Sequence, residues 1–125
     1  MRGHAVSILE RTTDEELQYY LLQLVQALRY EAADDSRLAR FITARAKQGV
    51  VLGSLLHWYL YTEWEDAEFG PRAQAVHRHL LAGASSLVGV VSDQIAMMAQ
   101  LQHIVRELKV GCCSCRVELL QGCQV

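Results

Sequence analysis

The chain has 125 residues, a length that suits one domain or part of one. A hydrophobic fraction of 51% is ample for a core and argues against disorder. The net charge is −2 with acidic and basic residues interspersed, so no basic surface for nucleic acid is expected. Residues 50–61, the longest apolar run, fall short of the roughly 20 residues of a membrane-spanning helix. We therefore expect a cytoplasmic protein that does not insert into a membrane.

Residues 14–31 carry the strongest helix signal in the chain. Thr13 and Glu16 have the spacing of a capping box, and acidic residues fill the first turn, where the helix dipole favours them. One apolar face is predicted from Leu17, Leu21, Leu24 and Leu28, with Tyr20 and Val25 beside it, and a second patch from Tyr19, Leu22 and Tyr30. A helix that is apolar on two sides is usually held between neighbouring helices.

Five further helices follow from apolar spacing and from the residues that start or end helices. They are expected at residues 4–11, 37–47, 50–66, 72–81 and 87–109. Ser36 is placed to cap the 37–47 helix, and Pro71 suits a helix start. Alternating runs typical of strands are absent from the sequence. The fold class predicted is all-α, a partial α-solenoid of antiparallel helix pairs.

Two other patterns bear on how these helices pack. The 87–109 helix carries two neighbouring apolar stripes: Leu87, Val91, Ile95, Met98 and Val105, and Val90, Met97, Leu101, Ile104 and Leu108. Glu63 falls in line with the apolar face of the 50–66 helix. Buried unpaired carboxylates are rare, so either this helix end is frayed or exposed, or Glu63 pairs with a nearby arginine. Trp58 and Trp64 are interpreted as packing residues rather than as a binding surface.

The histidines and cysteines do not have the spacing of a known metal site. The histidines are His4, His57, His77, His79 and His103, and the cysteines are Cys112, Cys113, Cys115 and Cys123. No His-x-x-x-His pair occurs, and the cysteines do not form two separated Cys-x-x-Cys pairs. Hydrogen-bonded or solvated histidines are expected, and residues 110–125 are predicted to be an irregular tail of exposed thiols.

No catalytic, cofactor-binding or metal-binding residue is predicted. Glu68, Phe69 and Gly70 resemble the metal-binding triplet of kinases with Glu in place of Asp, but they fall in a predicted turn. The sequence contains no asparagine, which a kinase catalytic loop needs for its second metal ion. It also lacks a Gly-rich phosphate loop and a Gly-x-Ser-x-Gly elbow. The chain alone is therefore expected to be inactive as an enzyme.

Several segments resemble one family in the right order. Residues 5–6 and 14–17, 21–31, 41–46, 56–66 and 80–83 are similar to the accessory helical (PIK) domain of phosphatidylinositol 3-kinases. The Trp-Tyr and Glu-x-Glu-Asp pattern in residues 56–66 is most like the class III enzymes. The resemblance covers about residues 4–109. We therefore expect residues 1–109 to be the C-terminal part of a PIK-type domain.

This resemblance implies a parent enzyme that transfers phosphate from ATP, with a divalent metal, to the 3-hydroxyl of phosphatidylinositol. It also implies C2 and kinase domains beside the helical domain, a regulatory protein kinase and a Beclin-type subunit as partners, and a peripheral location on endosomal and autophagic membranes. No motif of the kinase or C2 domain occurs in these 125 residues. Two hypotheses follow: a structural fragment of a class III enzyme, or a stand-alone helical scaffold for protein partners.

Overall fold

The computed structural model describes the backbone of residues 2–121 and the side chains of residues 5–109. The chain divides into two compact units, Met1–Val91 and Ser92–Val125. All secondary structure within residues 2–121 is helical. The predicted all-α fold is confirmed.

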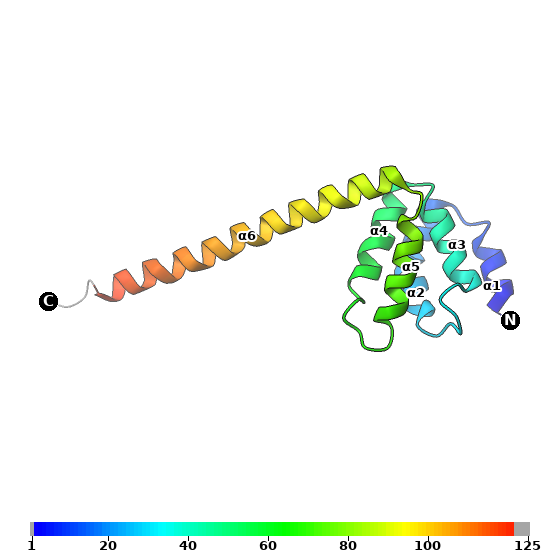
Figure 1. Ribbon diagram of the computed structural model, residues 1–125, viewed down its shortest axis with the longest axis horizontal. Helices are drawn as coiled ribbons and strands as arrows, with labels where there is room; N and C mark the ends of the chain where they lie inside the picture. The colour runs from blue at the N-terminus through cyan, green and yellow to red at the C-terminus, as the bar shows by residue number, and fades with distance from the viewer. Residues whose placement is uncertain (1, 122–125) are drawn as a thin grey trace. The chain divides into compact units, whose positions relative to one another are not determined.

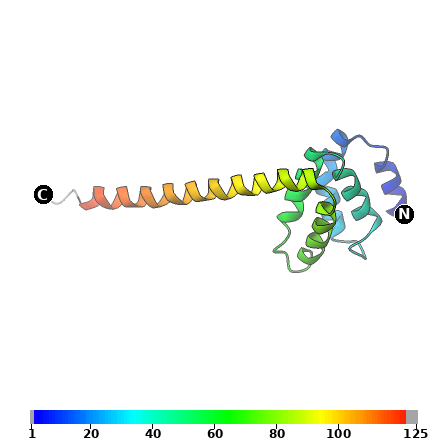
Figure 2. The same cartoon turned by 45° about the horizontal axis from the view of Figure 1, so that its top comes forward.

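The first unit contains five complete helices and the start of a sixth (Figures 1 and 2). They are α1 (Arg2–Leu9), α2 (Asp14–Leu28), α3 (Arg37–Ala46), α4 (Val50–Tyr61), α5 (Gly70–Leu81) and α6 (Ser85–Gln121). Helix α2 packs on α4, and α3 packs on both α1 and α5, while α3 also contacts α2 and α4. Alternate helices therefore share a layer, as expected for a solenoid of antiparallel helix pairs.

The predicted helix caps of α2 and α3 are both present. The hydroxyl of Thr13 accepts from the Glu16 backbone N–H at 3.3 Å, and the Glu16 carboxylate accepts from the Thr13 N–H at 3.1 Å. The Ser36 hydroxyl accepts from the Ala39 N–H at 3.1 Å. Each cap satisfies backbone donors that a helix start would otherwise leave unpaired.

The core of this unit is aliphatic and is built from every helix in it. Its fully enclosed large side chains include Leu17, Leu21, Val25, Leu28, Ile42, Leu52, Leu56, Leu60, Phe69 and Leu80. The predicted face of α2 needs one correction. Leu24 is only partly buried and Tyr20 is exposed, whereas Val25 is fully enclosed. The buried stripe of α2 is thus rotated toward Val25.

Helix α4 ends at Tyr61, one turn earlier than predicted. The hydroxyl of Thr62 donates to the Tyr59 carbonyl at 2.9 Å. The following connection folds closely over the start of α5: a Cβ added at Gly70 would lie 2.5 Å from the Trp64 carbonyl oxygen. Only glycine allows this close approach. The residues after Tyr61, which were expected to continue α4, therefore form a connection that packs against Gly70.

Helix α6 begins earlier and ends later than predicted. It follows Gly83, whose φ of 74° lies in the left-handed region that ends helices. The backbone stays helical through Gln121, so the predicted irregular tail is wrong for residues 110–121. That segment holds one glycine and no proline, and nothing in it stops a helix strongly. Residues 122–125 and the cysteine side chains lie outside what the structure describes, and a domain boundary at residue 109 stays a prediction.

Candidate functional site

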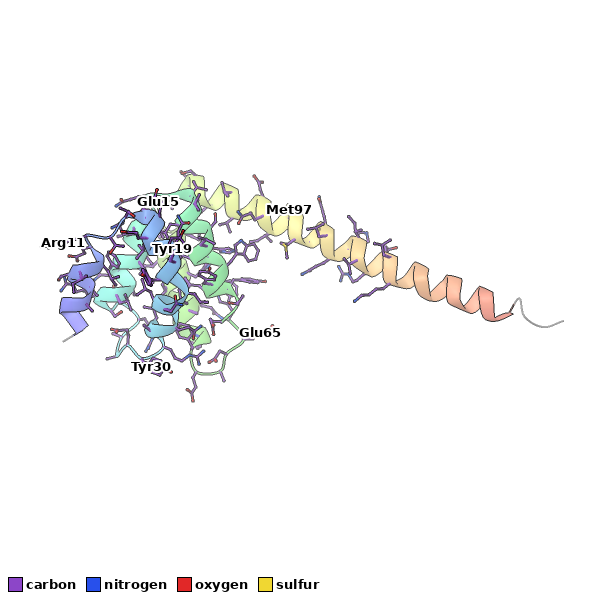
Figure 3. The ribbon with its side chains drawn as sticks, turned by 180° about the vertical axis from the view of Figure 1, so that it is seen from behind. Arg11, Glu15, Tyr19, Tyr30, Glu65 and Met97 are labelled. Atoms are coloured by element: carbon purple, nitrogen blue, oxygen red, sulfur yellow. The ribbon has the colours of Figure 1, made fainter. Side chains whose placement is uncertain are left out.

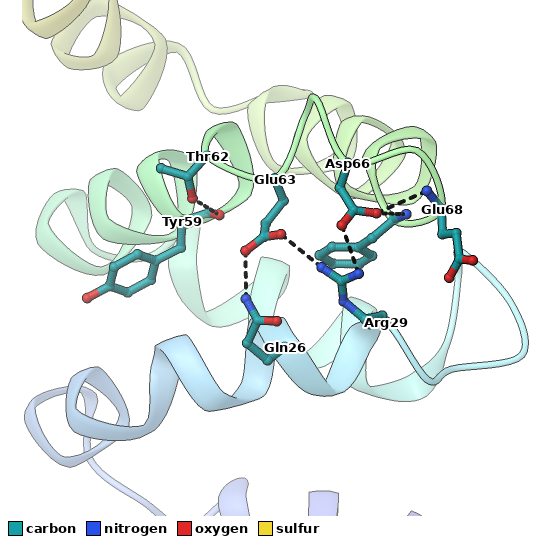
Figure 4. Close-up of polar contacts among 8 residues, drawn as sticks. Gln26, Arg29, Tyr59, Thr62, Glu63, Asp66 and Glu68 are labelled. Atoms are coloured by element: carbon teal, nitrogen blue, oxygen red, sulfur yellow. Dashed lines mark hydrogen bonds and ion pairs between the residues drawn. The ribbon is translucent and has the colours of Figure 1, made fainter.

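The most elaborate polar contact of the first unit joins α2 to the connection between α4 and α5 (Figure 4). We call Gln26, Arg29, Glu63 and Asp66 the clasp. Arg29 Nη2 lies 3.1 Å from Glu63 Oε2, and its Nη1 lies 2.9 Å from Asp66 Oδ2. Gln26 Nε2 donates to Glu63 Oε1 at 2.6 Å. Of the two alternatives left open for Glu63, pairing with an arginine is the one that the structure shows, and one guanidinium holds two carboxylates.

Asp66 also organises the start of α5. Its Oδ1 accepts from the backbone N–H groups of Phe69 at 2.7 Å and Glu68 at 3.0 Å. These two bonds and the Arg29 guanidinium lower the pKa of Asp66, the Phe69 bond contributing most. Arg29 lies 5.0 Å from the centre of the Phe69 ring, and its bond to Asp66 raises its own pKa. The clasp therefore holds the turn, α2 and a core aromatic together.

Arg72 of α5 makes a second link to α2. Its Nη1 donates to the backbone carbonyls of Leu28 and Arg29, at 3.0 and 3.3 Å, and to that of Glu31. Its Nε donates to Asp34 at 2.9 Å. These carbonyls belong to the end of α2, where a cation complements the helix dipole. Arg72 thus closes the same end of the helix that the clasp secures.

The chemistry of this region is that of an ion-pair network between helices. The side chains that form the ion pairs are between about one fifth and one third exposed.

Residues 68–70, which resemble a kinase metal-binding triplet in sequence, lie at the start of a helix in the structure. Glu68 is exposed, Phe69 is buried in the core, and Gly70 begins α5. Their placement serves the start of a helix.

A buried histidine pair joins α4 to α5. His57 Nδ1 and His77 Nε2 are 2.7 Å apart, and the two residues are 1% and 7% exposed. One ring must donate and the other accept. Burial lowers the pKa of His57 to about 4, with a smaller contribution from His77, and burial also lowers the pKa of His77. Both rings are therefore neutral near pH 7.

Aromatic rings surround this pair. The rings of Trp58 and Tyr61 lie 4.7 and 5.9 Å from that of His57, and Trp64 lies edge-on to His77 at 5.1 Å. His57 Nε2 and Trp64 Nε1 are buried without a hydrogen-bond partner in the part of the chain that the structure describes. Trp64 packs against the core and against His77 of α5, as predicted, whereas Trp58 makes ring contacts with His57 and Tyr61 of its own helix.

Sequence reasoning missed the histidine pair because its members lie on successive helices. One signal could have found it. Gly53, His57 and Leu60 are buried at i, i+4 and i+7 on α4, and Ala73, His77 and Leu80 have the same spacing on α5. A histidine in the middle of each apolar face is placed to meet the other once the helices pair.

The other histidines and the cysteines are not brought together by the described structure. His79 is exposed, and exposed His103 lies 3.9 Å from Glu107 one helical turn away. The side chains of His4 and of all four cysteines lie outside the described residues. Among the side chains that are described, no group of three His, Cys, Asp or Glu residues is arranged to hold a metal ion. No helix in the described range has the length and apolarity to cross a membrane.

Comparison with known proteins places this helical unit in a family. The accessory domain (PIK domain) of the phosphoinositide 3-kinase family matches residues 1–92. The chain belongs to this family. It is 38% identical over 117 residues to the root isoform of phosphatidylinositol 3-kinase from Glycine max, and 40% identical over 121 residues to phosphatidylinositol 3-kinase VPS34 from Arabidopsis thaliana. These alignments cover 94% and 87% of this chain but only 14% and 15% of the two relatives.

The PIK-domain match coincides with the packed helices. It ends at residue 92, and the first compact unit ends at Val91. The clasp, the histidine pair and Arg72 therefore all lie inside the matched segment. The resemblance to class III phosphatidylinositol 3-kinases is confirmed by these relatives. In this PIK domain, these polar side chains join α2 to the start of α5 and α4 to α5.

Proposed function

We propose that this chain acts as a structural part of a class III phosphatidylinositol 3-kinase and is not catalytic by itself. The parent enzyme transfers phosphate from ATP to the 3-hydroxyl of phosphatidylinositol, with a divalent metal, in a kinase domain. The helical segment is a rigid spacer that contacts the kinase and C2 domains. The parent complex includes a regulatory protein kinase and a Beclin-type subunit, and it works in the cytoplasm on endosomal and autophagic membranes.

The single observation that carries this proposal is the PIK-domain match over the packed helices, with both plant relatives being phosphatidylinositol 3-kinases. The contacts inside that segment support a structural role. Arg29 and Arg72, which reach across the helices, both bond to groups of the same helical unit. A region held by such links keeps a fixed shape, which a spacer between two domains requires.

A second candidate function is a stand-alone scaffold for a protein partner. One observation favours it. Tyr19 on α2 and Tyr30 just beyond its end are 81% and 73% exposed, and both are labelled in Figure 3. Leu22 on the same helix is also exposed. Exposed aromatic side chains are enriched where protein partners bind.

The proposal is tested by a chimaeric enzyme. The matched segment of the soybean root phosphatidylinositol 3-kinase is replaced by residues 1–92 of this chain, and phosphorylation of phosphatidylinositol by ATP is measured. We expect the chimaera to be active and the 125-residue chain alone to be inactive. Activity of the chain alone would contradict the structural role.

A matched pair of chimaeras controls for folding. Leu28→Asp places a charge in the core and should abolish activity together with the folded state, because Leu28 is fully buried. Ala44→Asp makes the same substitution at an exposed position of α3 and should leave the enzyme active. An inactive but folded chimaera without either substitution would favour the scaffold function instead.

A further inference from the structure

The contact between His57 and His77 lies in the middle of the interface between α4 and α5. These two helices are antiparallel and lie side by side (Figures 1 and 2). The side chains buried beside the pair are apolar or small: Gly53, Leu56, Leu60, Ala73, Val76 and Leu80. Water has little access to ring nitrogens in such surroundings, so each histidine depends on the other for a hydrogen bond.

The contact can accommodate only one proton between its two facing nitrogens. His57 Nδ1 and His77 Nε2 are 2.7 Å apart, so one of them donates and the other accepts. If the pair gains one proton, the charged ring donates through its facing nitrogen and the neutral ring still accepts. A second proton makes both facing nitrogens donors, and two positive rings then repel each other. The contact is therefore compatible with one added charge but not with two.

The surroundings of the two rings place the first proton on His77. The outer nitrogen of His57, Nε2, is buried and has no hydrogen-bond partner in the described part of the chain. His77 is the less buried of the two rings. A charge costs less where water can reach it. In the singly charged pair His77 Nε2 therefore donates to His57 Nδ1, and a second proton must enter the more buried ring.

Among the described residues, the carboxylates near these helices are exposed or already bound to arginine. Asp14 of α2 pairs with Arg45 of α3, and residues 15–16 are exposed. The other arginines of α3 pair with carboxylates outside the helices. In the connection before α5, the two carboxylates of the clasp are bound to Arg29 and the other two are exposed. A doubly charged histidine pair would thus lack a counter-ion.

The remaining ionisable groups around the pair do not favour a second proton either. The Tyr61 ring, 5.9 Å from that of His57, is a phenol that is uncharged in acid. Arg78 and His79 of α5 are exposed, and positive charges there oppose further protonation. Residues 85–91 of α6 contain no titratable side chain. In agreement, burial and then His77 lower the pKa of His57 to about 4, and burial lowers the pKa of His77.

The start of α5 is held by contacts that acid does not remove in this range. Asp66 bonds to two backbone N–H groups there and to Arg29, and these bonds lower the pKa of its carboxyl, which therefore stays ionised near pH 4. Arg72 donates to backbone carbonyls at the end of α2, which do not titrate. Acid thus puts charge into the middle of the α4–α5 interface while the start of α5 remains attached to α2.

We propose that the His57–His77 contact is an acid-operated latch, which a second proton opens so that the later half of α5 separates from α4 while the clasp keeps the start of α5 in place. Separation lets both rings reach water as cations. The core around α2 and α3 stays folded, because the change is confined to the side of α5 that the clasp does not hold. Acid therefore opens this interface before it unfolds the unit.

The test is backbone hydrogen exchange of the full 125-residue chain, followed by mass spectrometry from neutral pH down to about pH 4. Rates are corrected for the intrinsic effect of pH on exchange. We expect residues 77–82 to lose protection as the pH falls, while residues 17–28 of α2 keep theirs. The opening constant should rise at least about tenfold per pH unit, because the open form binds at least one more proton.

A variant with both His57→Asn and His77→Gln separates the proton from the hydrogen bond. Its two amides can hydrogen-bond to each other but cannot take up a proton. Protection of residues 77–82 should then no longer depend on pH. His79→Gln, an exposed histidine two residues from His77, is the matched control and should behave like the original chain. If circular dichroism shows the double variant unfolded, imidazole NMR signals of the original chain replace it, and those of His57 and His77 should titrate together with the loss of protection.

Three results would overturn the latch. The first is protection of residues 77–82 that persists down to about pH 4. The second is loss of protection in α2 and α5 at the same pH, which would mean that the whole unit unfolds at once. The third is a pH dependence that survives in the double variant, or imidazole signals of the pair that do not follow the exchange, because another group would then open the interface.

Discussion

Helix α2 and residues 92–109 of α6 have the same apolar spacing and opposite burial. On α2, Leu17, Leu21, Leu24 and Leu28 are separated by four, three and four residues, and so are Met97, Leu101, Ile104 and Leu108 on α6. Leu17, Leu21 and Leu28 have no exposed surface, whereas all four α6 residues are about half exposed or more.

The difference lies in what packs against each helix. α2 is in contact with α3 and α4, and the clasp and Arg72 tie its C-terminal end to the start of α5. Residues 92–109 lie in a unit that consists of one helix. Apolar spacing thus identifies the face of a helix that can be buried. Whether that face is buried depends on which other helices pack against it.

The largest effect on the free energy of unfolding is expected when one leucine of each region is replaced by alanine. Leu28→Ala should lower the free energy of unfolding by about 3 kcal/mol, since it leaves a cavity in a closed core. Leu108→Ala should change it by less than about 0.5 kcal/mol, because Leu108 is 68% exposed. Urea unfolding of the two variants beside the original chain measures both effects. Equal losses in the free energy of unfolding would contradict the difference in burial between the two regions.

An effect of pH on the free energy of unfolding is expected in the first unit. The pKa of His57 falls from its ordinary value near 6.5 to about 4 in the folded protein. The unfolded chain therefore binds more protons between pH 6.5 and pH 4, and stability falls as the pH drops through this range. For His57 alone, we expect a loss of about 2 kcal/mol between pH 7 and pH 5. Urea unfolding at the two pH values measures it.

Three variants show which histidine causes this pH dependence. His57→Phe removes one of the two buried rings and should reduce the change between pH 7 and pH 5. His79→Gln and His103→Gln alter exposed histidines of the two units and should leave it as it was. If His57→Phe retains the full dependence, another group is responsible and the buried pair is not the source.

Much of the fold could be predicted from local signals. The caps at Thr13 and Ser36 were recognisable because a capping residue and its target lie three residues apart in the sequence. The end of α4 was not, because it depends on contacts with residues far away in the sequence. α4 stops where Glu63 and Asp66 reach Arg29, and that partner lies more than thirty residues away. Sequence-based reasoning finds helix starts more easily than such stops.

Less of the candidate site could be predicted. Glu63 was recognisable as a carboxylate in line with an apolar face, and pairing with an arginine was one of two alternatives for it. Spacing did not specify which arginine. The His57–His77 contact was missed altogether because it arises only when α4 and α5 pair. Leu24 was expected to lie in the core, yet it lines a groove of about 440 Å³ between α1, α2 and α3. A charge at Leu24 should therefore cost less stability than one at Leu28.

A smaller effect is expected from two glycines of the first unit. A Cβ at Gly53 would lie 2.7 Å from the Ala46 carbonyl oxygen and 2.8 Å from Leu87, so Gly53→Ala forces α3 and α4 apart. Overpacking of about 2 kcal/mol, less about 1 kcal/mol gained in helix propensity, gives a net loss of about 1 kcal/mol.

Gly89→Ala is the matched control, because nothing lies within 4 Å of its added Cβ. It should stabilise the chain by up to about 1 kcal/mol through helix propensity alone. Thermal unfolding of the two variants side by side measures the difference. A stabilising Gly53→Ala would mean that α3 and α4 are not packed as closely as the comparison between the two regions requires.

The smallest effect is expected on the outer side of α2. Tyr19→Ser should change the free energy of unfolding of this chain by less than about 0.5 kcal/mol, because Tyr19 is 81% exposed. Leu21→Ser, two residues on and fully buried, should cost several times more. Urea unfolding of both variants tests whether α2 is covered on one side only. A large loss for Tyr19→Ser would show that its ring is covered in solution and that α2 is packed on both sides.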